Sequence, residues 1–169
     1  NNQSLDVTYD KLKNDKTVYR YSYSISFYLY LNPQSTSTNY AYNKETEIFN
    51  YGDKPIILYD GRNRTLLIKS RTQTENGSQF DTIYKTDNIK YQKWTHFIIN
   101  YQDNMIDVFM DGKIVGSKKN VPPYLTSDKV TIGYNNGIHG SIKDIFYFEK
   151  PRPPNDIEFL YNLFKKNKI

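Results

Sequence analysis

The feature that most constrains the fold is a series of short apolar segments, each followed by residues typical of turns. The segment at 21–31 (YSYSISFYLYL) alternates strictly at its start, with serines on one face. A period of two residues predicts a β-strand that is buried on one face. Further strands are expected at 47–51, 55–59, 65–69, 80–84, 94–101, 105–110, 113–117, 129–134 and 141–148.

Turn residues separate these segments at fairly even spacing. Asp111-Gly112 is the two-residue loop expected of a type I′ hairpin, in which both central residues need a positive φ. Asp60-Gly61 begins a similar connection. Because no repeated helices separate the strands, the predicted fold class is all-β, an antiparallel sandwich or jelly roll.

Only the C-terminal segment has a helical pattern. Asn155 is expected to cap the helix, with Glu158 three residues later. One apolar face follows, made of Ile157, Leu160, Tyr161 and Phe164. We expect a short helix that closes one end of the sandwich.

The length of 169 residues is that of one domain. We expect an N-terminal arm or edge strand at 1–19, one sandwich domain at 20–164 and a basic tail at 165–169. No signal peptide is expected at the start, and the missing initial Met indicates a fragment or a processed product. No apolar run approaches the roughly 18–20 residues of a membrane span.

The net charge of +5 is concentrated near the C-terminus, at Lys165, Lys166 and Lys168. A nucleic-acid surface needs a basic stripe with interleaved aromatic residues, so a solvated tail is favoured and nucleic acid is not an expected partner. Because the chain has no cysteine, disulfides, thiolate catalysis and Cys-ligated metals are excluded.

Five motifs follow one another in a set order from residue 94 to residue 162. They read WTHF at 94–97, IDVFMDGK at 106–113, VTIG at 130–133, GSIKDI at 140–145 and DIEFLY at 156–161. This order is similar to that of laminin-G-like and pentraxin-like domains of the concanavalin A-like lectin/glucanase superfamily. YSISFYL at 23–29 resembles the first core strand of the same fold, so the resemblance covers about residues 20–162.

Several residues within these motifs have expected structural roles. Trp94 is expected to fill the centre of the sandwich, because aromatic side chains bury the most area. Gly133 and Gly140 are expected where the backbone turns or approaches another segment closely. Asp144 is expected on the solvent-exposed face.

Catalytic groupings are not found. Glucanases of the superfamily carry E-x-D-x-x-E, which places two carboxyls on one strand face. Glu45 and Glu47 can share a face, but Thr46 lies between them and no third acid follows. His96 is interpreted as a hydrogen-bonded sheet histidine. We therefore expect no enzyme, with a degenerate glycoside hydrolase-like domain as a third alternative for the function.

Calcium is the cofactor that the resemblance suggests, since hard cations bind several oxygen ligands. In pentraxins an acidic and amide-rich run follows the I-G strand, but here Tyr134-Asn135-Asn136-Gly137 holds no carboxylate. Pentraxin-style double calcium binding is therefore not expected. A single calcium site at Asp103 and Asn104, or at Asp53 and Asp60, stays an alternative.

Loops at the ends of a sandwich can vary in sequence without disturbing its core, so a ligand is expected there. The candidate ligand-binding residues are Tyr51, Asp53, Tyr134, Asn135, Asn136 and His139. The 134–139 loop combines an aromatic ring, two amides and an imidazole, which suit stacking on a sugar and hydrogen bonding to it.

The leading hypothesis is a non-catalytic recognition module that binds carbohydrate or protein through these loops or through the concave sheet face. The alternative is a structural domain of a larger surface or viral capsid assembly with no small ligand. Both hypotheses place the chain in a larger parent chain or assembly that is extracellular, on a cell surface or on a virion surface.

Overall fold

The computed structural model describes residues 7–8, 22–34, 42, 44–119, 121, 129–133 and 137–166. The strands are β1 (Val7–Thr8), β2 (Tyr23–Leu31), β3 (Glu45–Tyr51), β4 (Ile56–Asp60), β5 (Thr65–Thr74), β6 (Gly77–Thr86), β7 (Trp94–Gln102), β8 (Met105–Met110), β9 (Lys113–Lys119), β10 (Lys129–Ile132) and β11 (Gly140–Phe148). The helix α2 (Pro154–Lys166) follows them. Every strand predicted from the sequence is present.

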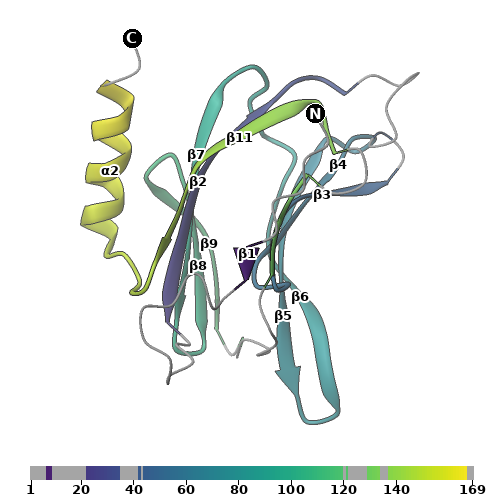
Figure 1. Ribbon diagram of the computed structural model, residues 1–169, viewed down its shortest axis with the longest axis vertical. Helices are drawn as coiled ribbons and strands as arrows, with labels where there is room; N and C mark the ends of the chain where they lie inside the picture. The colour runs from purple at the N-terminus through teal and green to yellow at the C-terminus, as the bar shows by residue number, and fades with distance from the viewer. Residues whose placement is uncertain are drawn as a thin grey trace.

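Two antiparallel sheets pack face to face (Figure 1). The six-stranded sheet has the order β1-β10-β3-β4-β5-β6, and the five-stranded sheet has the order β11-β2-β7-β8-β9. The predicted all-β sandwich with a C-terminal helix is confirmed. In the part of the chain that the structure describes, no helix is long and apolar enough to cross a membrane.

The core lies between the two sheets. Alternate residues of β2 point into it, and all of them are at most 3% exposed: Tyr23, Ile25, Phe27, Leu29 and Leu31. The ring of Phe27 stacks on Phe97 of its own sheet at 5.5 Å between centroids, and on Phe49 of the opposite sheet at 5.7 Å. Phe27 therefore contacts both sheets within the core.

The helix α2 packs on the outer face of the five-stranded sheet (Figure 1), not across an end of the sandwich as expected. Ile157 is fully buried against Ile98 and Phe109. The helix begins at Pro154, one residue before the predicted cap, and the Ile157 N–H donates to the carbonyl of Pro153 at 3.1 Å. Proline suits this first position because its fixed φ is helical.

This packing explains why β2 is buried on both faces, although its alternation predicted one wet face. Ser24 is fully buried, and its hydroxyl donates to the side-chain oxygen of Asn100 at 2.5 Å. The Asn100 amide in turn donates to the carbonyl of Arg152 at 2.7 Å, and the Arg152 N–H donates to the Ser24 hydroxyl at 2.9 Å. These hydrogen bonds fix the segment that leads into α2 on the sheet.

The predicted geometries of the Asp111-Gly112 turn and of Gly140 are confirmed. Asp111 and Gly112 have φ values of 50° and 81°, as a type I′ turn requires. A Cβ on Gly140 would lie 2.4 Å from the carbonyl oxygen of Tyr30, so β11 can approach β2 only with glycine there. Asp144 is exposed, as expected.

Two regions bear on the expected domain boundaries. Val7–Thr8 pairs with β10 at the edge of the six-stranded sheet. The helix α2 continues to Lys166, two residues past the boundary expected after residue 164. Lys165 therefore lies on the helix.

An ion pair joins the two sheets at the side where β6 approaches β9. The Lys118 ammonium on β9 lies 2.6 Å from a carboxylate oxygen of Asp81 on β6, and the Thr72 hydroxyl donates to the other oxygen at 2.7 Å. Partial burial acts to raise the pKa of Asp81, but the contacts with Lys118 and Thr72 outweigh it and lower that pKa below its ordinary value of 3.8.

We therefore expect Asp81 to stabilise the fold above about pH 4 and to lose this contribution as the pH falls through the lowered pKa. The reason is that the Asp81 carboxylate binds a proton less tightly in the folded state than in the unfolded state. Urea titrations of wild type and Asp81→Asn from pH 6 to pH 2 measure the effect. The wild type is expected to lose more stability than the variant, and parallel losses would contradict the prediction.

Candidate functional site

Two of the loop residues considered for a ligand or a metal, Asp103 and His139, lie at opposite ends of the sandwich. Asp103 follows β7, whose end pairs with the start of β2 through Tyr101 and Tyr23. His139 lies at the other end of β2, where its carbonyl accepts the N–H of Asn32 at 2.9 Å. Because β2 has nine residues at roughly 3.3 Å each, these ends are about 25–30 Å apart. One small ligand cannot contact both.

Of the other loop candidates, the structure describes Tyr51 and Asp53. Tyr51 is only 2% exposed and packs in the core, with its ring edge-on to Tyr23 at 5.8 Å between centroids. A carboxylate oxygen of Asp53 lies 3.6 Å from Arg71, and the other accepts the side-chain amide of Asn50 at 3.0 Å. Tyr134, Asn135 and Asn136 lie outside the described residues.

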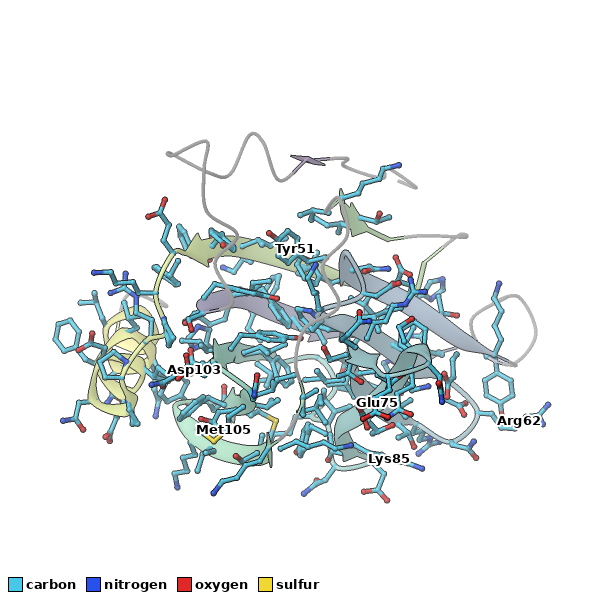
Figure 2. The ribbon with its side chains drawn as sticks, turned by 90° about the horizontal axis from the view of Figure 1, so that it is seen from below. Tyr51, Arg62, Glu75, Lys85, Asp103 and Met105 are labelled. Atoms are coloured by element: carbon cyan, nitrogen blue, oxygen red, sulfur yellow. The ribbon has the colours of Figure 1, made fainter. Side chains whose placement is uncertain are left out.

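Asp53 and Asp60, considered together for calcium, lie at opposite ends of β4, and each has other partners. Asp60 accepts two backbone N–H groups and a side-chain amide of its own turn, and the Asp53 carboxylate faces Arg71. Asp103 lies in the β7–β8 turn (Figure 2), where the Asn104 carbonyl accepts a backbone N–H. Within the described ranges no three His, Cys, Asp or Glu side chains gather as metal ligands.

The two glutamates of β3 each have a partner of their own. A carboxylate oxygen of Glu45 lies 2.8 Å from the Lys69 ammonium. Glu47 accepts a hydrogen bond from Asn50 at 3.2 Å, and burial raises its pKa. The Asp53 carboxylate accepts a hydrogen bond from the same Asn50 amide, and its charge contributes to the raised pKa of Glu47.

A pocket of about 320 Å³ lies between α2 and the outer face of the five-stranded sheet. Four aromatic side chains line it: Tyr28, Tyr30, Trp94 and Tyr161. Gln92, Lys93 and Lys165 complete its lining. This volume is within the range of about 300–1,000 Å³ that is typical of small-ligand sites. We call it the aromatic pocket.

Strand register brings two of these rings together. Tyr30 of β2 lies opposite Trp94 of β7, and their ring centroids are 5.3 Å apart. The residue before Lys93 is Gln92, which has a φ of 55° and donates its N–H to the carbonyl of Leu31 at 2.7 Å. This hydrogen bond ties the turn before β7 to the end of β2, and so positions Lys93 beside Trp94.

His96 forms the support beneath the aromatic pocket. It is 1% exposed, and its ring stacks on Tyr28 at 4.5 Å and on Tyr161 at 6.4 Å. Its Nε2 atom lies 2.8 Å from the hydroxyl of Ser26. The interpretation of His96 as a hydrogen-bonded sheet histidine is confirmed, and its ring connects α2 to the sheet.

The prediction that Trp94 fills the centre of the sandwich is wrong. Trp94 is half-buried on the outer face, because it has the same phase along β7 as His96 and Asn100. The inward-facing residues of this strand include Phe97 and Tyr101. Trp94 therefore adds a ring to the pocket and little to the core.

Charged groups around the aromatic pocket are mainly cationic. Lys93 and Lys165 are exposed, and both line the pocket. Burial, followed by the charges of Asp144 and Asp111, raises the pKa of Tyr28 to about 12. The Tyr28 hydroxyl therefore keeps its proton at neutral pH. The arrangement offers apolar ring surfaces edged by ammonium groups.

The fold is similar to that of several solved receptor-binding structures. The receptor binding domain of botulinum neurotoxin D is 16% identical, with a TM-score of 0.67 over 89% of this chain. The binding domain of botulinum neurotoxin DC, in complex with SialylT, is 19% identical with a TM-score of 0.61 over 85% of the chain. The same domain in complex with rat synaptotagmin II is 18% identical, also with a TM-score of 0.61 over 85%.

These similarities concern only part of each solved structure. The chain spans 36–40% of the length of the three structures. No curated protein sequence matches the chain significantly. A sequence profile described as "Concanavalin A-like lectin/glucanases superfamily" matches residues 6–158. The chain therefore belongs to the laminin-G-like branch of the concanavalin A-like lectin/glucanases superfamily.

Proposed function

We propose that this chain is a non-catalytic recognition domain that binds carbohydrate in the aromatic pocket. The observation that supports this proposal most is the pairing of Trp94 and Tyr30 beside a space of about 320 Å³. Aromatic rings offer apolar surface to the C–H groups of a sugar, while a few polar groups at the edge orient its hydroxyls. Gln92 and the two lining lysines are such groups.

The comparisons with solved structures also support a binding role. Two of the similar structures are binding domains in complex with SialylT and with rat synaptotagmin II. Because the similar structures are receptor-binding or binding domains of toxins, we propose an extracellular or surface-exposed setting for this chain. The paired glutamates of β3 give no reason to add catalysis, since the Glu45 carboxylate is already held by Lys69.

A second candidate function is packing within a larger chain or assembly. The solvent side of α2 exposes Phe159 by 64% and Leu163 by 44%. Apolar side chains at this exposure on one helix favour contact with another protein surface. This function uses the opposite side of the helix from the aromatic pocket, so the two are compatible.

A glycan array probed with the wild-type domain tests carbohydrate binding. It is run with calcium and with a chelator, and alongside the variant Phe80→Ala. Phe80 is 55% exposed on β6 of the opposite sheet, so this variant controls for loss of any surface aromatic. We expect selective binding that needs no calcium and survives in Phe80→Ala. The absence of binding to every glycan would contradict the proposal and favour the packing function.

A further inference from the structure

We propose that the ligand of the aromatic pocket is an acidic sugar, whose carboxylate or sulfate is bound between Lys93 and Lys165. This inference rests on carbohydrate binding in the pocket and adds the class of sugar. Both charged residues that line the pocket are lysines. They come from different elements, since Lys93 precedes β7 and Lys165 lies in the last turn of α2.

The helix position of Lys165 directs its charge to the pocket. Its ammonium lies 5.7 Å from the ring centroid of Tyr161, one turn earlier on the same helix. Tyr161 is itself held to the sheet, because its ring stacks on His96. An ammonium above an aromatic wall is well placed to bind an anion while the ring contacts the apolar part of the same ligand.

A third lysine, Lys143, contacts two rings of the pocket without being one of its lining residues. The Lys143 ammonium is 4.7 Å from the ring centroid of Trp94 and 5.9 Å from that of Tyr28. It also lies 3.7 Å from a carboxylate oxygen of Asp144, which partly compensates its charge. The proposal therefore assigns the anion to Lys93 and Lys165 and leaves Lys143 as a support of Trp94.

The carboxylates near the site do not cancel these charges within the pocket. Asp111 acts on Tyr28 from outside the lining, and its carboxylate accepts the backbone N–H of His96 at 3.0 Å. Asp144 likewise lies outside the lining and faces Lys143. An acidic sugar entering the pocket thus meets two ammonium groups and no lining carboxylate among the described residues.

The test compares one sugar core in three forms: lactose, sialyllactose and sulfated lactose. Binding is measured at low and high salt for wild type, for the double variant Lys93→Gln/Lys165→Gln and for the control Lys85→Gln. Lys85 is an exposed lysine on β6 of the opposite sheet. The carboxylated and sulfated arms show which anion the two lysines accept.

We expect the wild type to bind at least one acidic form about tenfold more tightly than lactose, since charge-assisted hydrogen bonds are the stronger kind. Added salt should reduce this preference because both lysines are exposed. The double variant should lose the preference and keep the weaker binding of lactose, whereas Lys85→Gln should behave as wild type.

Two results overturn this inference while carbohydrate binding in the pocket still stands. One is equal binding of lactose and both acidic forms by the wild type. The other is an acidic preference that persists in the double variant, which would place the anion at another cation. If the wild type binds none of the three sugars and no glycan on the array, the proposed function and this inference are both overturned.

Discussion

The variant Trp94→Ala is expected to weaken carbohydrate binding at least thirtyfold while leaving the fold intact. Truncating a central aromatic side chain of a binding site costs about 2 kcal/mol or more, which is roughly this factor. Trp94 lies half-buried on the outer face of β7, outside the core between the sheets, so the loss of folding stability should be only about 1–2 kcal/mol. Calorimetric titration and thermal unfolding measure the two effects separately.

Two further variants separate a binding role of Trp94 from a structural one. Trp94→Phe keeps an aromatic ring, so we expect it to retain part of the affinity. Tyr30→Ala removes the neighbouring ring of the pair and should weaken binding by a smaller factor. Unchanged affinity in Trp94→Ala, with a folded protein, would remove the aromatic pocket from the site.

The variant Phe27→Ala is expected to lower the free energy of unfolding by about 3–5 kcal/mol, the usual cost of truncating a fully buried Phe. Phe27 is fully buried and stacks on one ring from each sheet, Phe97 and Phe49. Removing it leaves a cavity between the two sheets, which no side chain from the surface can fill. Urea titration measures the change.

Phe80→Ala is the matched control for this stability measurement. The same ring is removed, but from an exposed position, where its contact is Arg71 at 6.0 Å from the ring centroid. We expect a loss below about 1 kcal/mol. Equal losses in the two variants would contradict the packing described for the core.

The strands could be predicted from the sequence because their signals are local. Alternation in the segment of β2 and the two positive φ values required at Asp111-Gly112 depend only on neighbouring residues. The position of α2 could not be predicted in this way. Its apolar face shows that the helix packs on something, but an end of the sandwich and an outer sheet face would both satisfy that face.

For Trp94 the sequence holds two conflicting signals, the alternation along its strand and the large size of its side chain. Its phase with His96 was visible in the sequence, and that phase separates it from Phe97 and Tyr101. The prediction instead followed its size, because a large aromatic residue is usually buried. The alternation along β7 was the better guide.

The aromatic pocket was missed because its residues are distant in the sequence. Tyr30, Trp94 and Tyr161 meet only through the pairing of β2 with β7 and the packing of α2 on both strands. Register and helix position are long-range properties, which no single motif specifies. Of the loop residues that the sequence favours, Asp103 and His139 are separated by the length of the sandwich.

Intrinsic fluorescence tests the central claim most directly, because Trp94 is the only tryptophan of the chain. The oligosaccharide that binds most tightly on the array is titrated into the wild-type domain, and its affinity is measured in parallel by calorimetry. Binding in the aromatic pocket predicts a change in Trp94 emission that saturates with the calorimetric dissociation constant. Calorimetric binding without any change in emission would contradict the account and place the carbohydrate elsewhere on the domain.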